Sequence, residues 1–180
     1  MTASVIDEAL RKAVTIGVDP AHCAGLDNFC WPDPVYDAKV TPDGQYKLAQ
    51  LVRSCKALSD YTRAYGVPCV SGKDSMKNDA RLAGKKISIP PTLLFSLIGK
   101  IHDYRKAVTM DPKKSGDGVY ILGSTHNELG GSEYSRLHAL NGGMVPTVDS
   151  TVAAKLYDVY AKAVEQGLVR SAHSPHKGGI

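Results

Sequence analysis

Apolar residues recur at spacings of three and four in three stretches of the chain, residues 4–16, 45–65 and 151–166. This spacing places them on one face of an α-helix, so the pattern predicts three amphipathic helices. Ser4 with Asp7 is predicted to cap the first helix, Asp43 the second, and Asp149 or Ser150 the third. A glycine follows each stretch, which is typical of a helix end.

Shorter apolar runs bounded by turn residues predict strands at residues 23–29, 67–70, 92–101 and 118–123, and residues 168–170 are a further candidate. The run at 92–101 is apolar enough for a strand that is buried on both faces. The polar residues 81–86 predict a loop. Strands and helices in this order predict an α/β or α+β fold, in which helices pack on one face of a sheet.

The first strand, the long helix and the second strand form a strand–helix–strand unit, which normally joins two parallel strands. Ligands gather beyond the carboxyl ends of such strands. Asp27 and Asn28 lie at the end of the first strand, and the segment Val70-Ser71-Gly72-Lys73-Asp74-Ser75 follows the second. We therefore expect these two segments to lie side by side, close enough for one ligand to contact both.

The residues after the second strand have the chemistry of a phosphate site. Gly72 is expected to open a turn whose backbone N–H groups approach a phosphate, and Lys73 supplies a cation. Asp74 offers carboxylate oxygen to a hard ion such as Mg²⁺, and Ser75 adds a neutral hydrogen-bonding group. The same residue types also make ordinary surface turns, so composition alone leaves both readings open.

Composition and charge narrow the function classes. The net charge of +4 is spread along the chain without a basic stripe interleaved with aromatics, which argues against nucleic-acid binding. The first residues lack the continuous apolar run of a secretion signal, and no run of 18 apolar residues predicts a membrane span. The four cysteines form no C-x-x-C pair and are expected to be buried free thiols.

Two further clusters have a metal-binding and a structural interpretation. Glu128 and Glu133 flank a glycine pair and could hold a metal, although their residue types favour an ordinary solvated turn. His173 and His176 are spaced for a zinc site but lack nearby further ligands. No nucleophile motif of a hydrolase is present in the sequence.

Four motifs in order, GLDNFCWPDP, VSGKDSMKND, IPPTLLFSLIGKIHDYRKAVTMD and ELGGSEY, resemble phosphoribosylformylglycinamidine synthase, an ATP-dependent enzyme of purine synthesis. The resemblance extends from about Ile6 to the C-terminus. It implies an aminoimidazole-ribotide-synthetase-like fold and an internal piece of a longer chain. Residues 1–110 would be the latter part of the synthetase-like N-terminal domain, and residues 111–180 the opening part of the C-terminal domain.

The resemblance also implies site residues. The position of Gly72 contacts nucleotide, that of Ser75 contacts formylglycinamide ribotide, and the region of Asp27 and Asn28 borders the ATP site. Many members have a metal-ligating asparagine at the position of Lys73. A protonated lysine cannot coordinate Mg²⁺, so the metal is expected at Asp74, with Lys73 contacting ATP instead.

The implied reaction is amidine formation from formylglycinamide ribotide, ATP and ammonia that a glutaminase partner supplies, in the cytoplasm, with ATP and Mg²⁺ as cofactors. The family's catalytic histidine has no counterpart here, so we expect no catalytic residue in this chain and no synthase activity from it alone. Of the family's terminal motif only His173, Gly178 and Gly179 match. Two other classes stay open: a non-catalytic nucleotide- or phosphate-binding module, and a structural piece that self-associates into a homo-oligomer.

Overall fold

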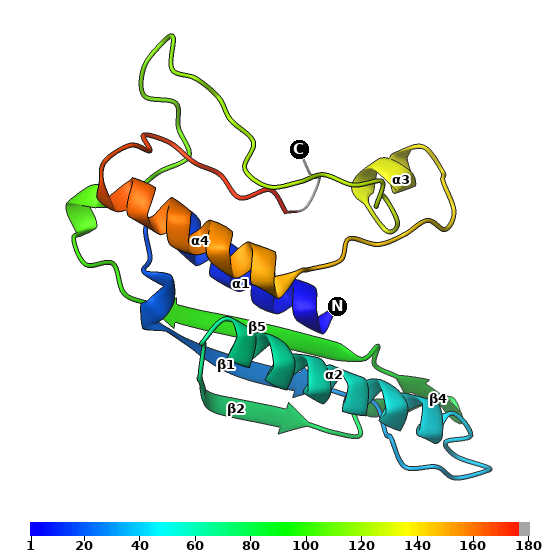
Figure 1. Cartoon of the computed structure of the whole chain (residues 1–180). Coiled ribbons are helices and arrows are strands. Elements are labelled where there is room, and N and C mark those ends of the chain that lie inside the picture. Colours follow the sequence, from blue (N-terminus) through cyan, green and yellow to red (C-terminus); the bar gives the residue numbers. More distant parts are fainter. Residues whose placement is uncertain (177–180) are drawn as a thin grey trace.

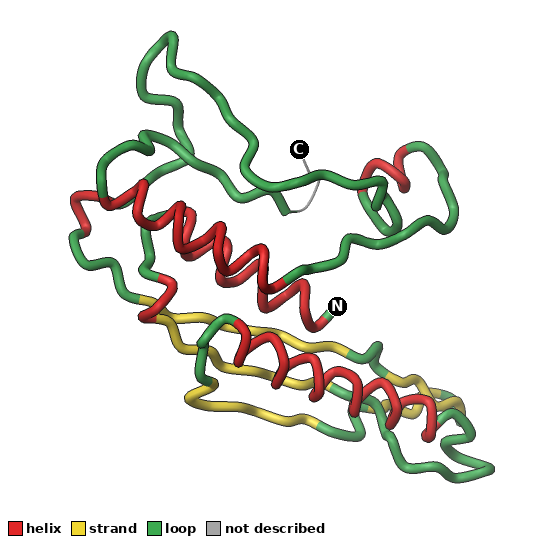
Figure 2. Tube along the Cα trace, viewed as in Figure 1, coloured by secondary structure: helices red, strands yellow, loops and turns green. Residues whose placement is uncertain are grey.

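The structure is a computed structural model that describes residues 1–176. Figure 1 and Figure 2 show a small sheet with α1 and α4 above it, α2 in front of it, and a long, largely irregular segment between β5 and α3. The helices are α1 (Thr2–Thr15), α2 (Gly44–Ala64), α3 (Glu133–Leu137) and α4 (Ser150–Glu165). The strands are β1 (Cys23–Cys30), β2 (Cys69–Ser75), β3 (Asp79–Leu82), β4 (Lys85–Ser88) and β5 (Thr92–Gly99). Two short 3-10 turns are η1 (Pro20–His22) and η2 (Tyr104–Lys106).

β1 is the central strand of a three-stranded mixed sheet with the order β2-β1-β5. It pairs with β2 in parallel and with β5 in antiparallel orientation. The helix α2 connects β1 to β2, as expected for a crossover between parallel strands. The predicted strand–helix–strand unit is therefore confirmed.

Both α1 and α2 cover the same face of this sheet. Ile6 and Leu10 of α1 are buried with Phe95 of β5, whereas Leu51 and Leu58 of α2 pack on Phe29 and Leu93. The larger buried cluster consists of Ile6, Leu10, Val14, Val18, Cys23, Tyr65, Val67, Phe95 and Tyr157. The predicted fold class, a mixed sheet with helices on one face, is confirmed.

The opposite face of the sheet is open in the described part of the chain. Alternate residues of a strand point to opposite faces, and in β5 Leu93 and Phe95 are buried while Leu94 and Ile98 are 55% and 71% exposed. The prediction that this strand is buried on both faces is therefore wrong for the chain by itself. The sequence is apolar on both sides, but only α1 and α2 supply cover.

Three local predictions also differ from the structure. Residues 81–86 belong to the β3–β4 hairpin instead of a loop, because Ala83 and Gly84 both take positive φ angles, 47° and 75°. Such angles are those of a tight hairpin turn. Residues 118–123 and 168–170 form no strand, and Val119 is 95% exposed without a partner strand among the described residues. Two cysteines, Cys55 and Cys69, are exposed, although all four are free as expected.

A buried carboxylate joins three helices. Asp7, expected at a helix cap, lies inside α1, where its Oδ1 accepts hydrogen bonds from the hydroxyls of Tyr65 at 2.8 Å and Tyr157 at 2.5 Å. Tyr65 ends α2, and Tyr157 belongs to α4. Burial, followed by the charge of Asp7, raises the pKa of both tyrosines well above the ordinary value. The helix of residues 150–165 thus packs on the helices that cover the sheet.

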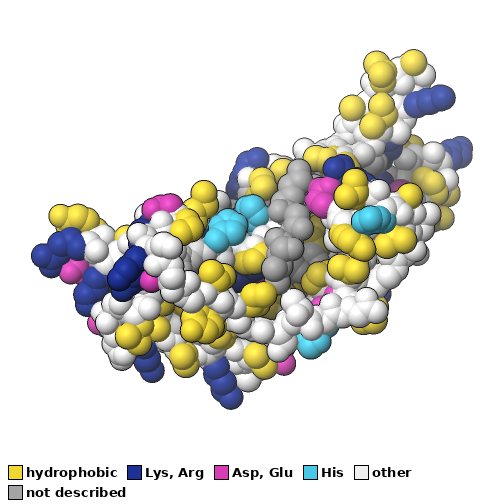
Figure 3. All heavy atoms as spheres, turned by 90° about the horizontal axis from the view of Figure 1, so that it is seen from above, with side chains coloured by type: hydrophobic (Ala, Val, Ile, Leu, Met, Phe, Trp, Pro, Cys, Tyr) yellow, Lys and Arg dark blue, Asp and Glu magenta, His cyan; other side chains and the backbone are white. Residues whose placement is uncertain are grey.

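The surface is chemically mixed. On the face seen in Figure 3, Lys and Arg side chains lie at separate places among hydrophobic and acidic ones.

Within residues 1–176, none of the helices combines the length and the apolar character that crossing a membrane requires.

We predict that Tyr157→Phe lowers the free energy of unfolding, because it removes one of the hydrogen bonds to the buried Asp7 carboxylate. Hydrogen bonds to charged groups contribute about 1.5–3 kcal/mol, and urea unfolding followed by circular dichroism measures the change. Tyr120→Phe is the matched control, since Tyr120 is highly exposed. Equal stability of the two variants would contradict the role of Asp7.

Candidate functional site

The two polar segments expected to form a site lie side by side. In the parallel ladder of β1 and β2, Asp27 is opposite Gly72 and Asn28 is opposite Lys73. These residues are more than forty positions apart in the sequence. The predicted juxtaposition is therefore confirmed.

The local conformation at Gly72 differs from the expectation. β2 runs from Cys69 to Ser75, and its pairing with β1 continues to Ser75 opposite Cys30. Gly72 is consequently inside the strand and does not open a turn; the chain turns later, at Lys77, which has a φ of 57°. The ladder with β1 overrides the turn preference of the Ser, Gly, Lys and Asp residues. The candidate residues thus lie along the two strands and not beyond their ends.

The alternation of side chains divides the candidates between the two faces of the sheet. Gly72 is opposite Asp27, and Asp74 is opposite the buried Phe29, so these residues lie toward the helix-covered face. Residues one position away lie toward the open face. They are Asn28, Lys73 and Ser75. Because β2 is an edge strand of the described sheet, a ligand placed over this edge is within reach of both faces.

The helix-covered side gathers negative charge beside α2. Cys55 is exposed as a residue, but partial desolvation of its sulfur raises the pKa of the thiol, and the charges of Asp74 and Asp27 raise it further. Gly72 leaves room for one of these carboxylates, since a Cβ at that position would be 3.0 Å from Asp27 Oδ1. Asp74 and Asp27 both lie close enough to Cys55 to act on its pKa, and carboxylate oxygen is the donor that Mg²⁺ prefers. The donor set at Asp74 and Asp27 fits such an ion.

The open side carries the cation. Lys73 Nζ donates to Ser75 Oγ at 2.7 Å, and Asn78 Nδ2 donates to the Ser75 carbonyl at 2.7 Å. An edge strand also presents unpaired backbone N–H groups outward. An ammonium and outward amides along one strand provide hydrogen-bond donors for a phosphate.

The other candidate clusters are engaged in local contacts. Glu128 accepts from the Thr147 hydroxyl at 2.9 Å, and Glu133 pairs with Arg136 at 2.7 Å. The rings of His173 and His176 lie 5.9 Å apart, edge to face, with no third ligand beside them in the described residues. Gly178 and Gly179 of the terminal motif lie outside the described residues.

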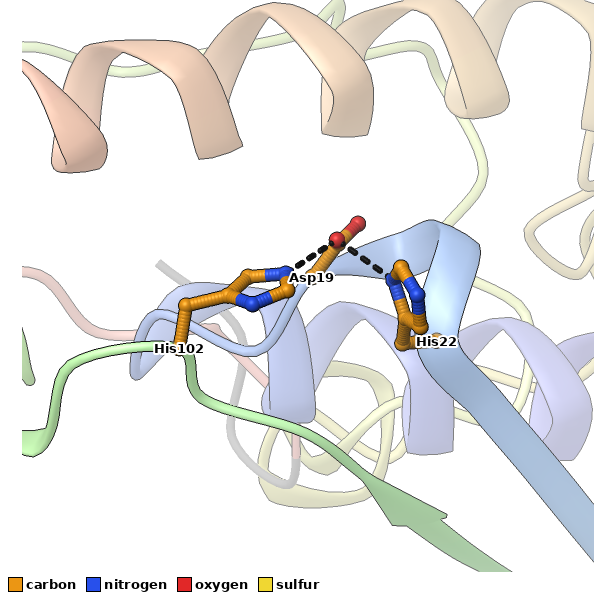
Figure 4. A group of neighbouring side chains, drawn as sticks. All are labelled: Asp19, His22 and His102. Carbon is orange, nitrogen blue, oxygen red and sulfur yellow. Dashed lines mark hydrogen bonds and ion pairs between the residues drawn. The ribbon is translucent and has the colours of Figure 1, made fainter.

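Sequence reasoning missed a cluster at the other end of β1. Figure 4 shows His22 and His102 pointing toward the Asp19 carboxylate. His22 Nδ1 and His102 Nε2 lie 2.7 Å and 2.8 Å from the same oxygen, Asp19 Oδ2. The hydrogen bond from His102 lowers the pKa of Asp19 to about 2, and contacts with Ala21 and His22 act in the same direction. These residues come together through the antiparallel pairing of β1 with β5, which no local sequence pattern reveals.

We predict that Asp74→Asn or Asp27→Asn lowers the pKa of Cys55, because each removes a negative charge that disfavours the thiolate. At a pH below that pKa the thiolate fraction rises, so Cys55 should react with iodoacetamide faster, by roughly twofold or more. Peptide mass spectrometry measures the rate at Cys55 separately from that at Cys69. Lys73→Met, on the opposite face of the sheet, is the control. If the aspartate variants react at Cys55 no faster than Lys73→Met, the placement of Asp27 and Asp74 on the helix-covered face is wrong.

Curated relatives match nearly the whole chain. The phosphoribosylformylglycinamidine synthase subunit PurL of Methanocaldococcus jannaschii is 33% identical over 98% of this chain, which covers 23% of the relative. The same subunit of Thermococcus sibiricus is 32% identical over 98% of the chain, again with 23% of the relative covered. The chain thus spans under a quarter of the length of these relatives. No protein-family model matches it.

Solved structures agree on the fold. Thermotoga maritima PurL complexed with FGAR matches 99% of this chain with a TM-score of 0.57 at 15% identity, and 26% of that chain is covered. The same protein complexed with ATP matches 99% with a TM-score of 0.55 at 16% identity, covering 24% of that chain. The curated relatives confirm the resemblance inferred from the sequence motifs: over nearly its whole length this chain is homologous to part of the phosphoribosylformylglycinamidine synthase subunit PurL.

Proposed function

We propose that the chain is a part of a PurL-type synthase and that its β1–β2 edge contributes to an ATP site. The parent reaction would join ammonia from a glutaminase to formylglycinamide ribotide at the expense of ATP, in the cytoplasm. The observation that carries the proposal is the register that sets Asp27 and Asn28 opposite Gly72 and Lys73. The relatives' name and the printed complexes of Thermotoga maritima PurL with ATP and FGAR support it.

Each residue then has a role that follows from its face of the sheet. Lys73 and the outward N–H groups beside Gly72 contact a phosphate of ATP, with Asn28 next to them as a neutral donor. Asp74 holds Mg²⁺, with Asp27 close by on the same face, and the ion would neutralise phosphate charge. Ser75, at the end of β2, contacts formylglycinamide ribotide.

The chain alone is not proposed to catalyse the synthase reaction. Phosphoryl transfer depends on positioning and charge neutralisation by several loops at once. This chain corresponds to 23% of its relative, so most of those elements belong to other parts of the relative's length. We propose that residues 1–110 correspond to the latter part of the synthetase-like N-terminal domain and residues 111–180 to the opening of the C-terminal domain.

A second candidate function is self-association through the open face of the sheet. Leu94 and Ile98 of β5 project from this face, and Leu26 lies beside them on β1. Apolar side chains clustered on an exposed face favour contact with a second surface. A second copy of the same chain could cover the face symmetrically, so we propose a homo-oligomer.

The ATP proposal predicts that Mg²⁺–ATP raises the melting temperature of the chain. A dissociation constant of about 1 mM corresponds to about 4 kcal/mol of binding free energy. Ligand at about ten times that constant adds about 1.4 kcal/mol of stability, which is a shift of about 3–6 °C for a chain of this size. Differential scanning fluorimetry measures the shift.

Lys73→Ala should abolish this shift, because it removes the phosphate-binding ammonium. Lys113→Ala is the control: Lys113 lies outside the sheet and pairs with Asp111. A shift that persists in Lys73→Ala would place the ligand elsewhere. Phosphate release with glutamine, ATP and formylglycinamide ribotide should stay at background, and turnover would contradict the proposal that the chain is only part of the synthase.

The self-association proposal predicts a dimer or larger species in sedimentation velocity at roughly tens of micromolar, where a moderate association constant suffices. Ile98→Glu places a charge on the open face and should shift the chain to monomer. Ile87→Glu alters an exposed residue of β4 and should leave the oligomer intact. A wild-type monomer would contradict the second candidate function and leave the ATP site unaffected.

A further inference from the structure

We propose that Asp19, His22 and His102 form a binding site for a divalent transition-metal ion of the Zn²⁺ type. The site is separate from the β1–β2 edge, because it lies at the start of β1 and just after the end of β5. Two imidazole nitrogens and one carboxylate oxygen converge there, and all three ligand atoms lie within 4.8 Å of one another.

The distances are suited to a metal with only small side-chain movements. Zn²⁺ binds nitrogen and oxygen at about 2.0–2.2 Å, which places neighbouring tetrahedral ligands roughly 3.3 Å apart. His22 Nδ1 and His102 Nε2 lie 2.7 Å and 2.8 Å from Asp19 Oδ2, a little closer than the ligands of a bound ion. Slight rotation of the two rings outward opens a position for the ion between them.

The backbone fixes the residues that carry the ligands. The amide of Asp19 donates to the Lys100 carbonyl at 3.0 Å, and the amide of Lys100 donates to the His22 carbonyl at 3.1 Å. These hydrogen bonds extend the β1–β5 ladder up to the cluster. The amide of Ala21 binds the other carboxylate oxygen, Asp19 Oδ1, at 2.9 Å. Such an outer hydrogen bond orients a ligating carboxylate and leaves Oδ2 directed at the two imidazoles.

The kind of ligand selects the kind of ion. Imidazole suits Zn²⁺ and similar transition ions, whereas Mg²⁺ prefers oxygen ligands only. Three protein ligands leave a coordination position open, as in zinc sites that bind water or a small anion. Both histidine side chains are about half exposed, at 54% and 52%, so an ion has access from solvent.

Two of the three ligand residues, Asp19 and His102, also line a cleft of about 450 Å³ between η1 and α4. Charged residues of both signs line this cleft; they are Asp103, Lys106, Asp158, Lys162 and Glu165. Because charges of both signs are present, the cleft does not repel a cation strongly. The two lysines favour an anionic group as the fourth ligand of the ion. A bound ion would tie the start of β1 to the segment after β5 and thereby stabilise the sheet.

The test is isothermal titration calorimetry of the full 180-residue chain, stripped with a chelator and fully reduced, with ZnCl₂ as the probe. We expect one high-affinity Zn²⁺ per chain, retained in the presence of excess Mg²⁺. Three variants each remove one ligand: His22→Gln, His102→Gln and Asp19→Asn. Each should weaken Zn²⁺ binding by at least about tenfold, because losing only a hydrogen-bond partner of a metal ligand already lowers metal affinity about tenfold. Asp19→Asn keeps a carbonyl oxygen for the Ala21 amide, so this variant retains the local turn.

His173→Gln is the matched control, because it removes a histidine from the other histidine pair and should leave the affinity unchanged. Co²⁺ bound at the site should give ligand-field bands without a thiolate charge-transfer band, since no cysteine is a ligand. The proposal would be overturned if the wild-type chain binds no Zn²⁺ at micromolar concentrations of the ion. It would also be overturned by unchanged affinity in the folded Asp19→Asn variant, or by a loss confined to His173→Gln.

Discussion

The arrangement of the molecule depends on the central position of β1, which forms hydrogen bonds with β2 on one side and β5 on the other. The parallel ladder sets Asp27 and Asn28 beside Gly72 and Lys73. The antiparallel ladder, continued by the backbone bonds of Lys100, sets Asp19 and His22 beside His102. Both candidate sites, the β1–β2 edge and the Asp19 cluster, are therefore assembled by β1 and lie toward its opposite ends.

The carboxylate of Asp7 fixes the layer above the sheet. Burying a charged group costs free energy unless the group is hydrogen-bonded or paired. Asp7 Oδ1 accepts hydrogen bonds from Tyr65 and Tyr157, and Asp7 Oδ2 lies 3.4 Å from Arg11 Nε in the same helix. The hydrogen bond from Tyr157 helps to specify where α4 packs, although α4 is separated from β5 by about fifty residues of mostly irregular chain. The helix therefore stabilises the covered face of the sheet from a distant part of the sequence.

The sequence was informative where one physical signal dominated. Apolar periodicity located α1, α2 and α4 to within two residues at each end, and the crossover rule brought Asp27 beside Gly72. The turn predicted at Gly72 was wrong. Ser, Gly, Lys and Asp favour turns locally, but the ladder with β1 keeps this part of β2 extended. The Asp19 cluster escaped because it requires the antiparallel register of β1 and β5, which no local pattern reveals. The residue roles came from the resemblance of the motifs, because periodicity carries no information on which ligand a residue contacts.

Nuclear magnetic resonance is the sharpest test of whether the β1–β2 edge binds a nucleotide phosphate. Backbone amide resonances of the labelled chain should be followed during titration with Mg²⁺–ATP. If ATP binds at this edge, the largest shifts occur at Asp27, Asn28 and residues 72–75, and they saturate with one common dissociation constant. Shifts confined to residues away from this edge, such as those lining the cleft beside α4, would contradict it.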